Sequence, residues 1–262
     1  MTANVDSQHQ LTRRTVFSPL SDSGRVEEVS QRIASAVHLG LLSDGEQLPS
    51  ETELAAQLSV STVTLREALM NLRNQGLIET RRGRNGGSFI RADRGTPTEV
   101  LHERLRGLSS TEWRDLGDEQ MAIEAAIAFV AAERATEEDV ERLHAVMELL
   151  PAATTPAARY QADSRFHLAL AVASQSERLT RSEIRILGET ADVMWLPHPD
   201  DELDQDAVQH AHAQIVAAIE AEDSELAARL ARAHAQAGTR RIRQLQLRAV
   251  AGDKRRNARR TK

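Results

Sequence analysis

The stretch LPSETELAAQLSVSTVTLREAL, residues 48–69, has the pattern of two short helices joined by a tight turn. Ser50 with Glu53 three residues later forms a capping box, which predicts that the first helix begins there. Ser61 can cap a second, longer helix that ends near Gly76. The positions that this second helix is expected to bury are Leu65, Ala68, Leu69 and Leu72.

The flanking segments extend this pair into a larger unit. Upstream, Val29, Ile33 and Val37 recur at helical spacing, and Gly40 supplies a stop. Downstream, two short apolar segments flank a glycine-rich and arginine-rich turn, in the order LIET (77–80), RRGRNGG (81–87) and SFIRA (88–92). Three helices followed by a hairpin predict a winged helix-turn-helix over residues 25–94.

The second helix of this motif carries polar side chains where a DNA-reading helix needs them. Such a helix must present its first two turns to base edges. Ser61, Thr62, Thr64 and Arg66 meet that need, and Ser50 and Thr52 begin the preceding helix. Thr62 and Arg66 are four residues apart and share a face opposite the leucines. In the alternative interpretation, Thr62 and Thr64 only start the helix and Arg66 pairs with a nearby glutamate.

The expected hairpin adds candidate contacts to the DNA backbone. Its arginines Arg81, Arg82 and Arg84 can bind phosphates or enter the minor groove. Gly86 and Gly87 lack side chains and so allow a close backbone approach. DNA binding is therefore predicted from the whole motif.

Composition sets limits on the class of protein. The 262 residues are 40% hydrophobic and 27% charged, as in an ordinary soluble protein, and carry a net charge of −6. Residues 25–94 hold nine Arg and nine Asp or Glu, so only local placement of charge favours nucleic acid. The absence of cysteine excludes disulfides and thiolate metal sites. No apolar segment resembles a signal peptide or a membrane span, so we expect a cytoplasmic protein with no membrane partner.

The rest of the chain is expected to be helical. Residues 1–24 are polar and patternless, which predicts disorder. Beyond a linker at Gly95–Pro97, residues 98–250 show only helical periodicity, with breaks that predict six or seven helices in an all-α domain. Residues 251–262 form a basic segment expected to be a disordered tail; a weak accessory contact to DNA is the alternative. The fold class is thus mainly α.

Four residues of the helical part can converge on a metal ion. Asp163 and His167 are four residues apart on one helix face. His212 lies about eleven residues before the Asp223–Ser224 turn and His234 about ten after it, so an antiparallel helix pair places both at one height. Asp with three His suits Zn²⁺, with nickel or manganese as competitors. The alternative is that these histidines are hydrogen-bonded core residues.

Residues 26–91 resemble the winged-helix domain of GntR-type bacterial transcription regulators. The matching segments are GLLSDGEQLPSETELAAQL, VSTVTLREAL and NQGLIETRRGRNGG. The family usually has arginine at the positions of Thr52 and Thr62, where it commonly contacts DNA, whereas Arg66 keeps its match. Replacing a bidentate arginine by threonine weakens guanine preference. The resemblance therefore implies DNA binding at an operator that differs from the family's usual one.

Residues 98–246 resemble the FCD effector domain of the FadR-like branch of that family. The matching pieces are EAAIAFVAAERAT (124–136), Asp163 with His167, HAQIVAAIEAEDSELA (212–227) and His234. In that domain the corresponding aspartate and three histidines bind a metal, and organic acids bind beside it. Gln120 replaces a usual arginine and Ser176 replaces a frequent asparagine. An amide does not neutralise a carboxylate as arginine does. The two replacements in the expected effector pocket, Gln120 and Ser176, therefore imply an effector that is a monoacid or a less charged molecule, or one that is recognised mainly by the metal.

These observations predict a ligand-responsive DNA-binding transcription regulator, not an enzyme. It would sense a small organic acid or related metabolite in a metal-containing helical bundle, and bind a palindromic double-stranded operator as a homodimer. One alternative is a DNA-binding protein whose helical domain only dimerises. A metal-dependent hydrolase is another, and it requires a general base near the metal; Glu124 and Glu220 are available, but no motif selects them.

Overall fold

The computed structural model describes residues 25–83, 86–91, 98–197 and 204–260. The segment 1–24, expected to be disordered, lies outside these residues. The chain divides into two compact units, Met1–Gly95 and Thr96–Lys262. Within the described ranges, none of the helices is long and apolar enough to cross a membrane.

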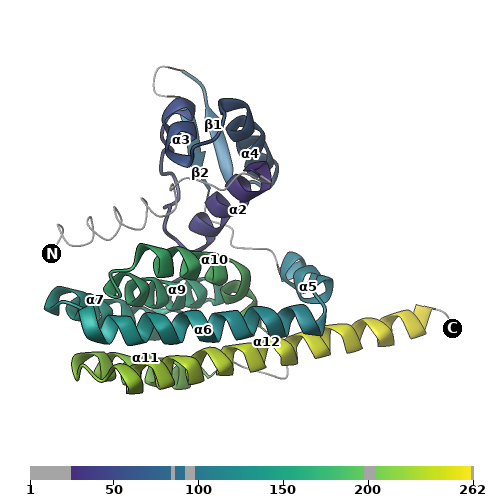
Figure 1. The fold of residues 1–262 in the computed structure, drawn as a ribbon. Coiled ribbons are helices and arrows are strands. Elements are labelled where there is room, and N and C mark those ends of the chain that lie inside the picture. Colours follow the sequence, from purple (N-terminus) through teal and green to yellow (C-terminus); the bar gives the residue numbers. More distant parts are fainter. Residues whose placement is uncertain (1–24, 84–85, 92–97, 198–203, 261–262) are drawn as a thin grey trace. The chain divides into compact units, whose positions relative to one another are not determined.

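The first unit is a winged helix-turn-helix (Figure 1). Its elements are α2 (Arg25–His38), α3 (Glu51–Leu58), α4 (Thr62–Asn74), β1 (Ile78–Arg81) and β2 (Gly87–Ile90). The two strands pair antiparallel, and Gln47 adds a bridge to Phe89 beside them. The fold class predicted for this part of the chain is confirmed.

Local sequence explains where the two helices of the motif begin. The Ser50 side chain accepts a hydrogen bond from the backbone N–H of Glu53, and the Glu53 carboxylate accepts one from the Ser50 N–H, as the capping box predicts. At α4, the Ser61 side chain accepts a hydrogen bond from the backbone N–H of Thr64. The predicted leucine stripe of α4 is buried, so its opposite face stays exposed.

The turn of the wing is shorter than expected by one residue at each end. Arg81 belongs to β1 and pairs with Gly87 of β2, rather than both lying in the turn. The Arg81 guanidinium lies 4.2 Å from the centre of the Phe89 ring and its Nε donates to Glu79 at 2.7 Å. These contacts with neighbours on the strands stabilise the extended backbone at Arg81.

The second unit is all-α, as predicted, and its helices end close to the predicted breaks. They are α5 (Thr98–Gly107), α6 (Ser110–Arg134), α7 (Glu137–Met147), α8 (Leu149–Ala152), α9 (Pro156–Ala173), α10 (Glu177–Met194), α11 (Gln205–Glu220) and α12 (Ser224–Arg260). The short α8 was not expected, because Pro151 lies inside it. Proline is tolerated in a first turn, where its missing N–H has no partner to lose.

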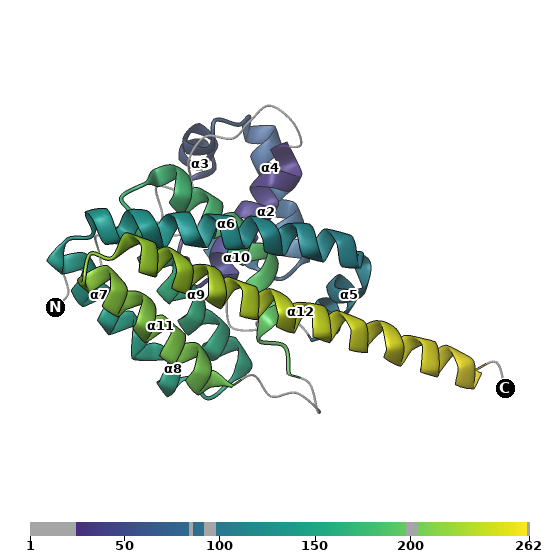
Figure 2. The same ribbon diagram turned by 60° about the horizontal axis from the view of Figure 1, so that its bottom comes forward.

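The long helices α6 and α12 lie side by side, with α11 folded back against α12 (Figures 1 and 2). Gly117 allows the close contact, since a Cβ there would lie 2.2 Å from Thr239 Cγ2. Helix α12 continues to Arg260, so the prediction of a disordered tail from residue 251 is corrected for the residues up to 260. Ala, Arg and Lys in this segment are strong helix formers, which explains the continuation.

The core of the second unit surrounds α9. Phe166, Ala169 and Leu170 on this helix pack with apolar residues of α6, α7, α11 and α12. Asp163 and His167 lie on the same helix and are 2% and 4% exposed. Helix α9 therefore carries polar side chains into an otherwise apolar interior.

Candidate metal centre and DNA-reading surface

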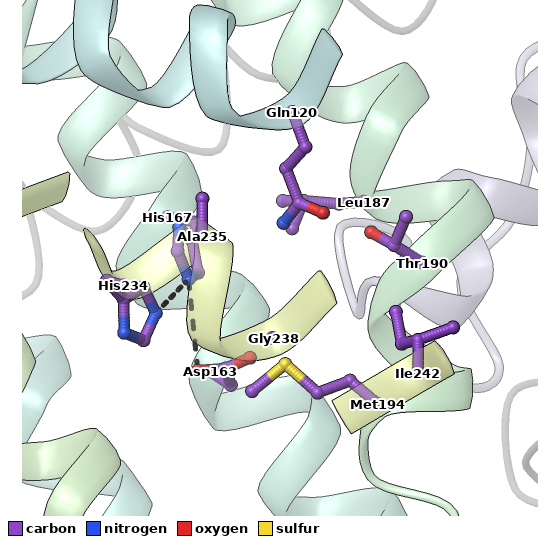
Figure 3. Close-up of a pocket in the computed structure, with 10 residues that line it drawn as sticks. All are labelled: Gln120, Asp163, His167, Leu187, Thr190, Met194, His234, Ala235, Gly238 and Ile242. Carbon is purple, nitrogen blue, oxygen red and sulfur yellow. Dashed lines mark hydrogen bonds and ion pairs between the residues drawn. The ribbon is translucent and has the colours of Figure 1, made fainter. Parts of the chain in front are cut away.

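The four predicted metal ligands meet inside the second unit. His234 Nε2 on α12 lies 3.3 Å from the Nε2 atoms of both His212 on α11 and His167 on α9. Asp163 Oδ1 lies 3.4 Å from His212 Nε2 and 3.9 Å from His167 Nε2. One donor atom from each of the four residues falls within 4.8 Å of the others. Figure 3 shows His167, His234 and Asp163 at one side of a cavity.

Neighbouring aromatic side chains hold these ligands in place. The Phe166 ring stacks on the His212 ring with their centres 3.7 Å apart. Trp195 Nε1 donates to Asp163 Oδ2 at 3.0 Å, while Asp163 Oδ1 has no hydrogen-bond partner. Sequence reasoning missed Trp195, which is 32 residues from Asp163 and follows the end of a different helix.

The histidines are held in their neutral form. Burial lowers the pKa of His167 and of His234 to about 4, and lowers that of His212 well below its ordinary value. Burial also raises the pKa of Asp163. A neutral imidazole has one nitrogen with a free lone pair. The three Nε2 atoms and the unpartnered Asp163 Oδ1 can therefore all act as electron-pair donors to one ion. A divalent cation satisfies all four atoms, and the donor set fits Zn²⁺.

Two buried glutamates lie on the other side of the His167 ring. His167 Nδ1 is 3.8 Å from Glu124 Oε2 on α6 and 3.7 Å from Glu183 Oε1 on α10. Gln120 Nε2 donates to Glu124 Oε1 at 2.7 Å. Burial raises the pKa of Glu124 to about 8 and that of Glu183 well above its ordinary value. Sequence reasoning missed Glu183, because no spacing relates it to the ligands.

The cavity beside the four ligands has a mixed lining. Its residues are Gln120, Asp163, His167, Leu187, Thr190, Met194, His234, Ala235, Gly238 and Ile242 (Figure 3). Gln120, one of the two predicted effector-pocket residues, lines this cavity. Ser176 is not among the lining residues; its hydroxyl caps α10 by accepting from the Leu179 N–H. This lining contains no Lys or Arg.

The predicted DNA-reading residues lie at the start of α3 and α4. Thr52, Thr62 and Arg66 are exposed. Arg66 Nε donates to Glu51 at 2.7 Å, which is the pairing that the alternative interpretation anticipated, but the arginine side chain remains 66% exposed. The hydroxyls of Ser61 and Thr64 hydrogen-bond to each other.

An apolar neighbour in the first turn of α4 was also missed. Val63 is 62% exposed, whereas the other four valines of this unit that the structure describes are buried or partly buried. An exposed methyl group in the first turn of such a helix can contact a thymine methyl in the major groove.

The wing glycines serve the wing's own packing. A Cβ on Gly86 would lie 2.5 Å from the Arg81 carbonyl oxygen, and one on Gly87 would lie 2.7 Å from Gln47 Nε2. Their small size is therefore explained without a ligand. Arg81 and Arg82 are exposed, and Arg84 lies outside the described residues.

A winged helix-turn-helix with an exposed polar first turn on α4, followed by an all-α unit with a buried polar centre, defines a DNA-binding transcription regulator with a separate sensing domain. Comparison with known proteins supports this class. Residues 25–89 match the bacterial regulatory proteins of the gntR family, and residues 115–237 match the FCD domain. The chain belongs to the GntR family and carries an FCD effector-binding domain.

Several relatives have regulatory names. The chain is 40% identical to the putative HTH-type transcriptional regulator RmpR of Mycobacterium gastri, over 84% of this chain and 80% of that protein. It is 29% identical to the Uxu operon transcriptional regulator of Escherichia coli, over 77% and 80% of the two chains. The solved structure of E. coli McbR/YncC has a TM-score of 0.51 at 16% identity, covering 85% of this chain and 99% of that one, and shares the fold.

The family and these relatives are transcription regulators, so the hydrolase alternative is set aside.

Proposed function

We propose that this GntR regulator binds a divalent metal through Asp163, His167, His212 and His234 and senses a small effector beside it. The observation that carries the proposal is the convergence of three buried imidazole Nε2 atoms, 3.3 Å apart in two of their pairs, on a carboxylate oxygen without a hydrogen-bond partner. Leaving the buried Asp163 Oδ1 unpartnered beside three imidazole nitrogens that can bond only to one another is costly, and a metal would remove that cost.

The ligand set favours zinc, with nickel or manganese as the competing ions. When bound, the ion supplies positive charge and open coordination positions for an oxygen of the effector. The protein's own contribution is to keep the imidazoles neutral and to orient Asp163 through the Trp195 N–H.

The effector we propose is a small organic acid or related metabolite with at most one carboxylate. Gln120 lines the cavity, but its amide already donates to Glu124. The cavity lining has no Lys or Arg to pair with a second carboxylate, and Glu124 and Glu183 lie close behind His167. A second carboxylate would therefore be buried without a basic side chain from the cavity lining to pair with it.

For the DNA-reading half, we propose contacts from the first turn of α4 and from the wing arginines. The base-reading candidates are Thr62, Arg66 and the exposed Val63, with Thr52 at the start of α3. The protein would act in the cytoplasm as a homodimer on a palindromic operator, because two copies of one reading helix match two symmetric half-sites.

Elemental analysis of purified variants tests the metal site. We expect native protein to retain about one divalent ion per chain, and Asp163→Ala and His212→Ala to lose it. His210→Ala is the matched control, since His210 lies on the same helix and is exposed. One divalent ion per chain in purified His212→Ala would contradict the proposed metal site.

Thermal shift of the metal-loaded protein tests the effector. We expect monocarboxylates to raise the melting temperature more than matched dicarboxylates do. Selection of bound sequences from random DNA, with and without the best ligand, then tests the operator and its symmetry. A helical domain that only dimerises would respond to neither metal nor ligand.

A further inference from the structure

At the proposed metal site, a buried imidazole nitrogen and a neighbouring buried carboxyl group both lack hydrogen-bond partners, and one can donate where the other can accept. His167 Nδ1 has no hydrogen-bond partner, and neither has either carboxyl oxygen of Glu183. The two residues are 4% and 1% exposed, and Nδ1 lies 3.7 Å from Glu183 Oε1. Buried groups of this kind are rare in folded proteins, so each one calls for a physical explanation.

Metal binding at His167 Nε2 supplies that explanation. A neutral imidazole that gives its Nε2 lone pair to a metal must carry its proton on Nδ1, and that N–H needs an acceptor. Glu124 and Glu183 are the carboxylates close to it. Glu124 already accepts a hydrogen bond from Gln120, whereas Glu183 accepts none in the described structure.

We infer that Glu183 is a positioning residue that accepts the His167 Nδ1–H bond and thereby sets the affinity of the metal site. This inference rests on the metal site proposed above. Trp195, directly after α10, holds Asp163 in a similar way. Both α9 ligands are therefore supported from α10 and its end, the same helix that contributes Leu187, Thr190 and Met194 to the cavity.

Zinc affinity of three variants, measured by competition with a chromogenic chelator, tests the role. Loss of an outer hydrogen-bond partner of a metal-bound histidine typically weakens metal binding by about 10- to 100-fold. We expect a loss in that range for Glu183→Leu and a smaller one for Glu183→Gln, whose amide oxygen still accepts. Glu189→Gln is the control, a partly exposed position on the same helix whose carboxylate pairs with Arg185, and it should bind zinc like native protein.

Stability of the metal-free variants separates positioning from a folding defect. Glu183→Leu replaces an unpartnered buried carboxyl by an apolar group, so its metal-free melting temperature should equal or exceed that of native protein. Cobalt substitution adds a spectroscopic readout, because a reoriented His167 should change the visible absorption bands of the bound ion in Glu183→Leu.

Failure of this inference and failure of the proposed metal site give different results. Native-like zinc affinity and cobalt spectrum in a folded Glu183→Leu would overturn the inference and leave the metal site intact. Two ions per native chain, one of them lost in Glu183→Leu, would make Glu124, His167 and Glu183 a second cation site instead, which also overturns it. Native protein that binds no metal would overturn the proposed function and this inference together.

Discussion

At the scale of single residues, Thr62 is the most informative position of the DNA-reading half. It is exposed in the first turn of α4, where GntR regulators usually carry an arginine, and Arg66 one turn later is held by Glu51. The short hydroxyl side chain reaches less far into a groove than arginine and cannot make a bidentate bond to guanine. We therefore propose that the choice of operator depends on this residue.

We predict that Thr62→Arg binds a family-type operator more tightly. A bidentate contact is worth about 1–3 kcal/mol, so the gain should be roughly fivefold or more in a gel-shift titration. Asn74→Arg, which adds the same charge at the exposed C-terminal end of α4, is the control and should not gain this preference. No difference between the two variants would remove Thr62 from the base-reading set.

Glu124 makes the stability of the metal-free protein depend on pH. Burial raises its pKa from 4.5 to about 8. Between these values the folded chain binds more protons than the unfolded chain, so the contribution of Glu124 to the free energy of unfolding falls as pH rises.

We therefore predict that metal-free Glu124→Gln gains stability over native protein as pH increases. The gain should be smallest at pH 5 and reach the order of 1–3 kcal/mol at pH 8, measured by urea denaturation at both pH values. Parallel stability curves for the two proteins, with a constant difference, would contradict the assignment of the raised pKa to Glu124.

At the scale of elements, the contact between α6 and α12 organises the second unit. His234 reaches the centre from α12, and Gln120 and Glu124 reach it from α6. The spacing of these two helices is set where Gly117 faces Thr239. A small residue at this crossing thus determines how closely ligand and pocket residues approach.

We predict that Gly117→Ala destabilises the protein by about 1–3 kcal/mol, because the added Cβ must displace a packed threonine. Its metal affinity should fall as well, since His234 moves with α12. Gly107→Ala is the matched control: a Cβ there meets nothing within 4 Å, and its melting temperature should stay close to the native value. Equal melting temperatures of the two variants would show that the crossing can absorb a methyl group.

At the scale of the whole molecule, the proposed metal centre brings together side chains from three helices that span residues 156 to 260. Its proposed ligands come from α9, α11 and α12. A ligand that binds only the folded chain stabilises it by mass action, by about 2.7 kcal/mol when its concentration is 100 times its Kd. The sensing domain should therefore depend on the ion for stability.

We predict that a chelator lowers the melting temperature of native protein and that added zinc restores it. His212→Ala should melt at a temperature that neither reagent changes, while His210→Ala should respond like native protein. Scanning calorimetry resolves these cases. A native protein indifferent to chelation would indicate that the four side chains form only a packed core.

Some of the site could be predicted from sequence because its geometry is local or nearly so. Asp163 and His167 share one helix face by their spacing, and His212 and His234 are symmetric about one helical hairpin. The capping box at Ser50 and the leucine stripe of α4 follow from short-range rules in the same way. Glu183, Trp195 and the pairing of Arg66 with Glu51 depend on how separate helices pack, and no spacing encodes them.

The sequence by itself determined the order of elements, the winged helix-turn-helix, the all-α sensing unit and the four candidate ligands. Helix periodicity, caps and turn residues act over a few positions, so they can be read directly along the chain. Only the tertiary structure decided which side chains lie beside those candidate ligands, that Ser176 caps a helix rather than lining the cavity, and that Glu183 has no hydrogen-bond partner. These outcomes depend on how polar groups are buried where separate helices pack, and residues far apart in the sequence meet there.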